Sequence, residues 1–149
     1  MIFQTDSRLD PSFNKYGCLF DCHAWYREAG MGQPWTAEAL DAAWMEAVQR
    51  GIIDHQFVLQ KPQALCDFLG LNLKVLTRID ENGIESTHFP IDTAIVGGMF
   101  AITEWHNDRT GFTHFVLGAA KPVVFDPIEG GSVTVAEGYP VSYRLFQIV

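Results

Sequence analysis

The sequence is poor in basic residues and has no long hydrophobic run. Its 10 lysines and arginines stand against 18 acidic residues, which gives the 149 residues a net charge of −8 at pH 7. An acidic surface repels phosphate backbones, and no dense Lys/Arg cluster offsets this charge, so the sequence predicts no nucleic-acid binding. No apolar run approaches the roughly 20 residues that cross a bilayer, and we expect no membrane insertion.

Cysteine is also scarce, and a targeting signal is missing. Three cysteines, an odd number, do not form a disulfide framework for a chain of this size. The first residues carry neither the basic flank nor the apolar stretch of a signal peptide. We therefore expect a reduced, soluble, cytoplasmic protein that folds as a single domain over residues 1–149. Composition does not indicate its oligomeric state.

The segment 18–29 predicts the first helix, because it contains no helix breaker and is followed by Gly30. At 100° per residue, one face of this helix collects four residues: Cys18, Cys22, Trp25 and Ala29. Asp21 lies off that face. We expect the helix to bury this one side in the core, with Cys18 at its N-terminal end.

Two more helices are expected before residue 70. One is indicated between Pro34 and Gly51, with Thr36 as the N-cap and with an apolar stripe made of Ala37, Leu40, Trp44, Ala47 and Val48. The other runs over 62–69 and begins with a proline in the first-turn position that proline favours.

After Gly70 the hydrophobic period changes to two, which is typical of strands. The segments 71–78 and 84–89 flank a turn at 80–83 and predict a hairpin. Five further strand segments are expected: 93–105, which Gly97-Gly98 can interrupt, 112–119, 123–125, 132–136 and 142–149. This order predicts an α+β fold, with N-terminal helices packed on a C-terminal antiparallel sheet.

Cys18 is a candidate nucleophile because of its position. A thiol at a helix N-terminus faces the positive end of the helix dipole and the unpaired N–H groups of the first turn, and both favour thiolate over thiol. Gly17 before it removes a side chain that would crowd an incoming carbonyl group. The alternative is a small buried residue, which is the interpretation that we favour for Cys22 and Cys66.

His114 and Asp126 flank a tight connection around residues 119–122. A hairpin centred on Ala120 puts His114 opposite Asp126 on the same side of the sheet. Asp126 can then hydrogen-bond the imidazole and leave the other ring nitrogen for proton transfer. The alternative is a solvated histidine and aspartate at strand ends. Together with Cys18, this pair would supply the three residues of a Cys–His–Asp catalytic site.

The polar loop 105–111 lies between two expected strands and is long enough to form the rim of a site. We therefore keep Trp105 and His106 as candidate substrate contacts.

A metal site is the main chemical alternative. Its ligands would be Cys18, Cys22 and His23, with Cys66 or His114. We do not favour a metal, because the chain has no Cys-x-x-Cys pair and because His23 points about 100° away from Cys22 around a helix.

Five short segments occur in an order that is found in a known family. They are Gln4-Thr-Asp-Ser-Arg-Leu9, Tyr16-Gly-Cys18 opening a helix that ends at Gly30, Pro34-Trp-Thr-Ala-Glu-Ala-Leu40, Thr113-His-Phe-Val-Leu-Gly118 and Val123-Val-Phe-Asp-Pro127. In this order, over nearly the whole chain, they resemble the papain-superfamily cysteine peptidases of the double-glycine-leader (bacteriocin-processing) type. Relatives of that type occur in bacterial and phage genomes.

The resemblance implies a papain-like fold and no metal or organic cofactor. It implies Cys18 as nucleophile, His114 as general base and acid, and Asp126 as the residue that orients His114. It also implies that the side-chain N–H of Gln4 contributes to the oxyanion hole, alongside the backbone N–H of Cys18. Asn14, four positions before Cys18, is a rival donor.

The function expected from these residues is hydrolysis of a peptide or amide bond through a thioester on Cys18. The expected substrate is a peptide or a peptidoglycan-like molecule, and a leader peptide, a cell-wall cross-link and a phage or host protein all stay open. The alternative function is a catalytically silent papain-like domain that serves as a peptide-binding or interaction module.

Overall fold

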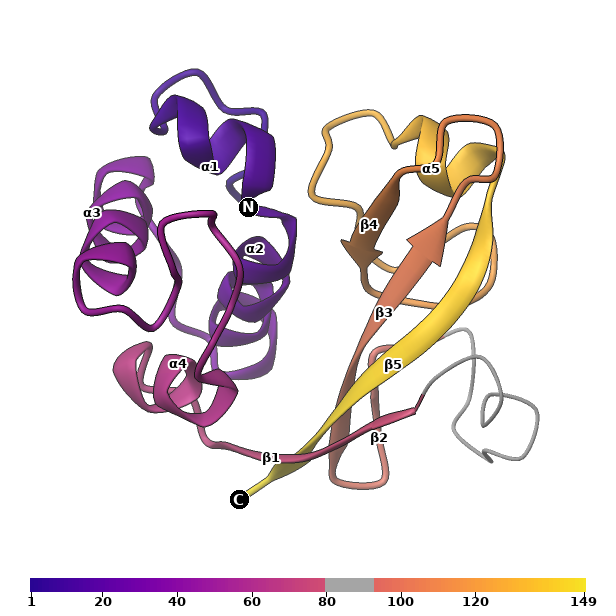
Figure 1. Cartoon of the computed structure of the whole chain (residues 1–149). Helices are drawn as coiled ribbons and strands as arrows, with labels where there is room; N and C mark the ends of the chain where they lie inside the picture. The colour runs from indigo at the N-terminus through magenta and orange to yellow at the C-terminus, as the bar shows by residue number, and fades with distance from the viewer. Residues whose placement is uncertain (80–92) are drawn as a thin grey trace. The chain divides into compact units, whose positions relative to one another are not determined.

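Helices form the chain up to residue 68 and strands dominate it from residue 73, which confirms the expected α+β fold class (Figure 1). The computed structural model describes residues 1–79 and 93–149. The chain divides into two compact units, Met1–Asn72 and Leu73–Val149, and each is described by itself.

The first unit is built from helices and their connections. The helices are α1 (Pro11–Tyr16), α2 (Cys18–Trp25), the π-helix η1 (Tyr26–Gly30), α3 (Ala37–Gln49) and α4 (Pro62–Phe68). The expected second and third helices are confirmed as α3 and α4, because their start signals are local. Thr36 Oγ1 accepts a 3.1 Å hydrogen bond from the Ala39 N–H, and Pro62 opens α4. Helix α1 was not expected, since six residues are too few to show a period.

Helix α2 is buried on nearly all sides. The helix predicted over 18–29 is present, with η1 as its last turn. The prediction of a single buried face is wrong, because Asp21 is fully buried whereas Ala29 is exposed. On a helix that is buried on most of its surface, a polar residue does not mark a solvent side.

Three aromatic side chains form the centre of the first unit's core. Phe13, Phe20 and Trp44 make edge-to-face pairs with ring centroids 5.2–5.8 Å apart. The indole N–H of Trp44 donates a 2.9 Å hydrogen bond to Ser12 Oγ, so the buried polar atom is satisfied. The apolar stripe predicted on α3 is therefore confirmed as core, with Val48 half-buried at its edge.

The second unit is an antiparallel sheet. Its strands are β1 (Leu73–Ile79), β2 (Ile95–Val96), β3 (Met99–His106), β4 (Thr113–Val116) and β5 (Tyr139–Ile148). In the described residues the strand order is β1-β5-β3-β2, and β4 also pairs with β3. Figure 1 shows the long strand β5 running beside β3, with the short helix α5 (Val133–Ala136) near β4.

The expected strands are partly confirmed. Gly97 and Gly98, both at positive φ, break the segment 93–105 into β2 and β3. The predicted turn at 80–83 and strand at 84–89 lie outside the described residues. The segment 123–125 contributes only one bridge, between Phe125 and Leu117.

The strand predicted at 132–136 is wrong, because this segment forms α5. Ser132 Oγ accepts a 3.2 Å hydrogen bond from the Val135 N–H and so caps the helix. This cap overrides the β-propensity of the sequence Val-Thr-Val.

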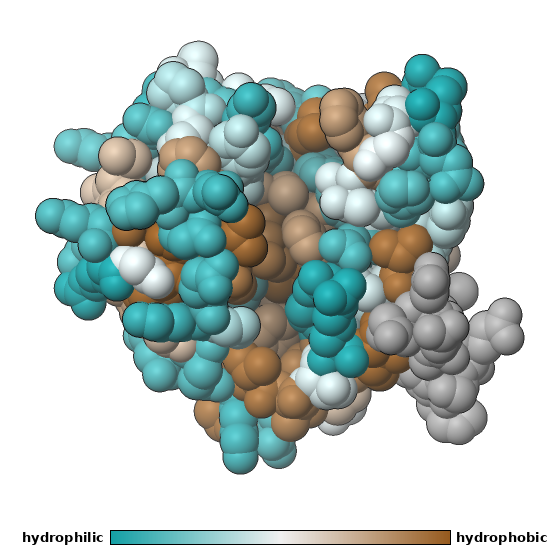
Figure 2. Space-filling view, viewed as in Figure 1, coloured by the Kyte–Doolittle hydropathy of each residue, from teal (hydrophilic) through white to brown (hydrophobic). Residues whose placement is uncertain are grey.

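Hydrophilic residues dominate the surface over α3 at the left edge of the space-filling view, as expected for the polar face of an amphipathic helix (Figure 2). None of the helices in the described ranges has the length and apolar character required to cross a bilayer.

Candidate active site

Cys18 is the first residue of α2, as the sequence predicted. Gly17 separates α1 from α2, and a Cβ atom at this position would lie 2.6 Å from the Phe13 carbonyl oxygen and 2.8 Å from its ring. This contact is a reason for glycine that needs no substrate, and the interpretation that Gly17 makes room for a substrate carbonyl stays a prediction. Glycine is required here because a side chain would collide with the carbonyl group and the ring of Phe13, four residues earlier in the chain.

The three cysteines differ in accessibility. Cys18 is half-buried, whereas Cys22 and Cys66 are fully buried, which confirms the last two as core residues. Burial, with a smaller contribution from the charge of Asp67, raises the pKa of Cys66 to about 12. A buried thiol of this kind does not act as a nucleophile at neutral pH.

His114 and Asp126 form a buried hydrogen-bonded pair in the second unit. His114 lies in β4, and its Nε2 is 2.7 Å from Asp126 Oδ1. Each side chain is 7 % exposed. The contact predicted from the sequence is therefore confirmed, whereas the alternative of two solvated residues is wrong.

The hairpin register from which this contact was predicted is wrong by one residue. The isolated bridge pairs Leu117 with Phe125, so the connection is centred on Lys121 and not on Ala120. The Leu117 carbonyl oxygen accepts from both the Val124 and the Phe125 N–H groups, and the chain leaves the ladder after Phe125. Asp126 thus reaches His114 from a loop, which is free of the alternation that a strand imposes.

Four donors hold the Asp126 carboxylate. Oδ1 accepts from His114 Nε2 and from the Ile128 N–H at 2.9 Å, and Oδ2 accepts from the Ser132 N–H at 2.9 Å and the Ser132 hydroxyl at 2.7 Å. Burial by itself raises the pKa of Asp126. The hydrogen bonds from His114 and Ser132, the charge of His114 and the Ile128 N–H outweigh burial and lower this pKa below its ordinary value.

This arrangement assigns the protons of the pair. An ionised Asp126 can only accept hydrogen bonds, so Nε2 of His114 is the donor. In the neutral imidazole the lone pair then resides on Nδ1, which can take up a proton as a general base does. The second unit therefore contains an oriented histidine whose tautomer is fixed by a buried carboxylate.

Ser132 is a site residue that the sequence did not reveal. It is 6 % exposed, and its hydroxyl both donates to Asp126 and caps α5. The sequence Gly130-Gly131-Ser132 carried the signal of an N-cap after a turn. Its link to Asp126 depends on how the loop 126–132 folds, and no local pattern encodes that.

The candidate substrate contacts Trp105 and His106 have different environments. Trp105 is 2 % exposed inside β3, opposite His114, and its indole N–H donates to the Gly118 carbonyl at 3.0 Å. The placement of Trp105 at the rim of a loop is therefore wrong, and its side chain packs in the core with Val116 and Val135. His106 ends β3 with a side chain that is 28 % exposed and 3.3 Å from Asp108, so its contact with a substrate stays a prediction.

Gln4 and Asn14 interlock in the first unit. Gln4 Nε2 donates to the Asn14 carbonyl at 3.0 Å, while Asn14 Nδ2 donates to the carbonyl oxygens of Gln4 and Asp6 at 2.6 and 3.0 Å. Both N–H groups of the Asn14 amide are thus used, so Asn14 is corrected from a rival oxyanion donor to a brace of the N-terminal segment. Gln4 uses one N–H in this way, and its oxyanion role stays a prediction.

The described residues contain no group of three or more His, Cys, Asp or Glu side chains that could hold a metal ion. The candidate metal ligands named from the sequence lie in different surroundings. His23 Nδ1 is 2.8 Å from the Leu19 carbonyl, and Cys22 and Cys66 are buried in the core.

A comparison with protein families assigns the chain to one family. The model of the family described as "Protein of unknown function, DUF261" matches residues 1–148, so the chain belongs to this family. The comparisons with curated proteins and with solved structures give no match.

Proposed function

We propose that the chain is a papain-like cysteine peptidase or amidase in which Cys18, His114 and Asp126 act as one catalytic set. The proposal combines a half-buried thiol of the first unit with the oriented histidine of the second. One observation carries it: His114 is buried and held through Nε2 by a carboxylate whose two oxygens accept four hydrogen bonds. Such an arrangement fixes the ring tautomer that a general base requires, with the lone pair on Nδ1, and this supports the proposal.

The proposed reaction begins with proton transfer from the Cys18 thiol to Nδ1 of His114. The Cys18 sulfur then attacks the carbonyl carbon of a peptide or amide bond, and the resulting oxyanion accepts from the Cys18 backbone N–H and from the side-chain N–H of Gln4. The imidazolium gives its proton to the leaving nitrogen as the C–N bond breaks, which leaves a thioester.

A water molecule completes the proposed cycle. His114 takes a proton from this water, the resulting hydroxide attacks the thioester carbonyl, and the C–S bond breaks. The Cys18 sulfur recovers a proton from His114, and the products are an amine and a carboxylic acid. Asp126 stays ionised throughout and stabilises the imidazolium, as the aspartate of a catalytic triad does.

The test is the pH dependence of alkylation at each cysteine. The reduced full-length protein is treated with iodoacetamide between pH 5 and 9, and labelling is followed site by site by mass spectrometry. We expect Cys18 to react well below pH 8, whereas an ordinary cysteine titrates near pH 8.5. His114→Ala should slow this reaction at pH 6 by at least about tenfold, because the thiolate loses its imidazolium partner. The exposed His55 provides the control, and His55→Ala should leave the profile unchanged.

The outcome that contradicts the proposal is equal and slow labelling of all three cysteines, or labelling of Cys18 that does not depend on His114. That outcome favours the silent peptide-binding module.

A further inference from the structure

Asp21 is a buried acid on the helix that carries Cys18. It follows Cys18 by three residues in α2, a spacing at which two helical residues are neighbours on the helix surface. Its side chain is fully buried, and its carboxylate oxygens accept no hydrogen bond of normal length and angle from the residues that the structure describes. Burying a carboxyl group costs free energy that an apolar residue at the same position would not cost. The presence of Asp21 therefore points to a contact that an apolar side chain cannot make.

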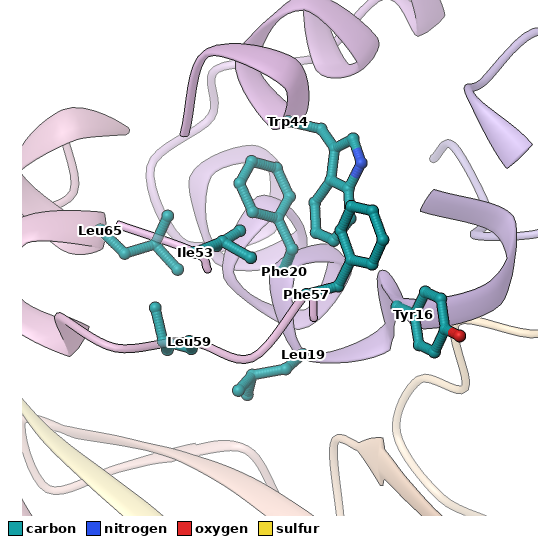
Figure 3. Close-up of a pocket in the computed structure, with 8 residues that line it drawn as sticks. All are labelled: Tyr16, Leu19, Phe20, Trp44, Ile53, Phe57, Leu59 and Leu65. Carbon is teal, nitrogen blue, oxygen red and sulfur yellow. The ribbon is translucent and has the colours of Figure 1, made fainter. Parts of the chain in front are cut away.

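The apolar core of the first unit does not supply that contact. The two residues before Asp21, Leu19 and Phe20, lie among the apolar side chains of this core, and the ring of Phe20 packs against Trp44 (Figure 3). Asp21 lies about 100° further around the helix than Phe20. The group that Asp21 serves therefore belongs to a segment on another side of α2.

Gln4 is the residue of the N-terminal segment that lies beside Asp21. Burial raises the pKa of Asp21 well above its ordinary value, and the nearby backbone N–H of Gln4 is the largest of the influences that lower it. Within the described ranges, no backbone carbonyl accepts from this N–H. Gln4 is only 4 % exposed, and buried N–H groups without an acceptor are rare. The Asp21 carboxyl group is thus the acceptor that the Gln4 N–H has at hand.

The side chain of Gln4 is held by Asn14. Gln4 Nε2 donates to the Asn14 carbonyl at 3.0 Å, and the Asn14 side chain donates to the Gln4 carbonyl at 2.6 Å. The reverse orientation of the Gln4 amide would place Oε1 against the Asn14 carbonyl, where two acceptors repel each other. One amide N–H of Gln4 is therefore committed to Asn14, and the second is the one that the proposed mechanism directs to the oxyanion.

A donor to an oxyanion has to be placed accurately. Such donors act at about 2.7–3.1 Å from the oxygen, and a misplacement of about 1 Å can cost about 100-fold in rate. The hydrogen bonds with Asn14 fix Gln4 relative to α1, whereas the backbone N–H of Cys18 belongs to α2. Two donors on different elements converge on one oxygen only if Gln4 is also fixed relative to α2. Asp21 is the side chain of α2 that lies at the Gln4 backbone.

We propose that Asp21 is a positioning residue, whose buried carboxyl group holds the Gln4 backbone against α2 and so places the Gln4 amide at the oxyanion that forms on Cys18. The inference rests on the proposed function for the role of Gln4. It assigns no proton transfer to Asp21, which acts only as an acceptor for the Gln4 N–H. An acceptor oxygen is therefore required at this position, and a negative charge is not.

Reversible addition of an aldehyde measures oxyanion stabilisation apart from thiol reactivity. The probe is N-acetylglycinal, labelled with carbon-13 at the aldehyde carbon. The Cys18 sulfur bonds to this carbon, the thiol proton passes to the carbonyl oxygen, and the oxygen of the resulting hemithioacetal takes the place of the oxyanion. Carbon-13 NMR gives the dissociation constant. Iodoacetamide is the reference reagent, because displacement of iodide by the Cys18 sulfur forms no oxyanion.

Three substitutions test the contact. Asp21→Leu removes the acceptor and should weaken the hemithioacetal by about tenfold, while the iodoacetamide rate at Cys18 changes by less than about twofold. Asp21→Asn keeps an acceptor oxygen and should bind the aldehyde within about twofold of wild type. Asp41→Leu is the matched control, because Asp41 Oδ1 accepts from the Asp10 N–H at 2.6 Å and so holds the same N-terminal segment at another residue. It should leave both measurements unchanged.

A double-mutant cycle separates positioning from a general structural role. Gln4→Ala should weaken the hemithioacetal by about tenfold or more, and Asp21→Leu should add little to that loss, because the amide that it positions is absent. Asp21→Ala repeats the cycle with a smaller side chain where leucine does not fit. Independent losses that multiply, a Gln4→Ala variant with unchanged affinity, or an Asp21→Asn variant as weak as Asp21→Leu overturns the proposal. An aldehyde affinity and an iodoacetamide rate that fall together in Asp21→Leu overturn it as well.

The two proposals fail in different ways. Wild-type aldehyde affinity in Asp21→Leu, with His114-dependent alkylation of Cys18 intact, overturns the role of Asp21 alone. Alkylation of Cys18 that does not depend on His114 overturns the proposed function, whatever the aldehyde affinities of the variants are.

Discussion

At the scale of single residues, Asp126 is the most constrained side chain of the candidate site. Its two oxygens accept hydrogen bonds from one histidine, one hydroxyl and two backbone N–H groups. Asparagine at this position must turn its NH₂ group toward either the Ile128 or the Ser132 N–H, because each carboxylate oxygen accepts from one of them. One backbone donor then loses its acceptor whichever way the amide is oriented.

Asp126→Asn should therefore destabilise the protein by about 1–3 kcal/mol at pH 7. The native state lowers the pKa of Asp126, so the stability that this carboxylate contributes is present above its ordinary titration range. The difference between wild type and variant should be full above about pH 4 and shrink as the pH falls below it. Urea unfolding at a series of pH values measures this difference.

Asp108→Asn is the matched control for this substitution. Asp108 also lies beside a histidine, but its side chain is 76 % exposed. Its replacement should change the free energy of unfolding by less than about 0.5 kcal/mol. A loss of equal size in both variants would contradict the assignment of Asp126 as a buried, multiply bonded group.

At the scale of elements, α2 carries a buried acid that the candidate mechanism does not use. Both carboxylate oxygens of Asp21 are buried and accept no hydrogen bond of normal length and angle within the described part of the chain. Burial raises the pKa of Asp21 well above its ordinary value, and the nearby Gln4 N–H and the amino terminus lower it by less. In the folded protein Asp21 thus holds a proton at pH values where the unfolded chain has released it.

Asp21→Asn should stabilise the protein at pH 7 by on the order of 1 kcal/mol or more, since the amide is neutral in both states. Because the folded state retains the proton, the wild type loses stability as the pH rises above the ordinary titration range of aspartate. The advantage of the variant should accordingly shrink as the pH falls toward 4. Thermal and urea unfolding between pH 4 and 8 measure it.

The exposed Glu38 on α3 serves as the reference for that experiment. Glu38→Gln removes a negative charge from the first turn of a helix, so it should cost a few tenths of a kcal/mol instead of giving a gain. An Asp21→Asn variant that is less stable than wild type at pH 7 would show that Asp21 is ionised and paired.

Three helices of the described residues begin with a side-chain cap, α1 with Asp10, α3 with Thr36 and α5 with Ser132, and only the last of these caps belongs to the candidate site. Ser132 caps α5 and also donates to Asp126, whereas Thr36 caps α3 and lies in the other unit. Ser132→Ala and Thr36→Ala should each destabilise the protein by about 0.5–2 kcal/mol. Only Ser132→Ala should also shift the pH profile of Cys18 alkylation toward that of an ordinary thiol, because Asp126 loses one of its donors. Equal profiles for the two variants would assign Ser132 a purely structural role.

The caps also explain how far the elements could be predicted from the sequence. Thr36, Pro62 and the glycines after each helix act within a few residues, so α3 and α4 could be predicted. The sequence Val-Thr-Val after Ser132 has a strong β-propensity, and the helix forms because the cap and the loop from Asp126 determine the conformation. The burial of Asp21 depends on packing from all sides of α2, which periodicity cannot express.

The candidate site, too, could be predicted only in part. The hydrogen bond between His114 and Asp126 could be predicted, because a short connection brings two nearby segments together. Its details could not, since the bridge at Leu117 shifts the centre of the connection by one residue and Asp126 lies beyond the ladder. The role of Ser132 and the buried position of Trp105 could not be predicted either, because both depend on contacts that the sequence pattern does not show.

At the scale of the whole molecule, net charge is the property that acts on every approaching reactant. The chain carries a net charge of −8 at pH 7, so its field disfavours anions near any accessible group. Cys18 is half-buried and therefore within reach of small reagents, whereas the other two cysteines are buried in the core. The same field should favour neutral or basic peptides over acidic ones as substrates.

Iodoacetamide and iodoacetate measure this field, because they share a leaving group and differ by one negative charge. At pH 7 and about 10 mM ionic strength, where the Debye length is about 30 Å, we expect Cys18 to react with iodoacetamide in clear preference to iodoacetate. The ratio of the two rates should fall several-fold at about 1 M, where that length is about 3 Å. A small uncharged thiol, 2-mercaptoethanol, gives the intrinsic ratio and its own salt dependence. A ratio at Cys18 that follows 2-mercaptoethanol at every salt concentration would show that the acidic surface does not reach Cys18, and the expected preference for neutral or basic peptides would then lose its electrostatic basis.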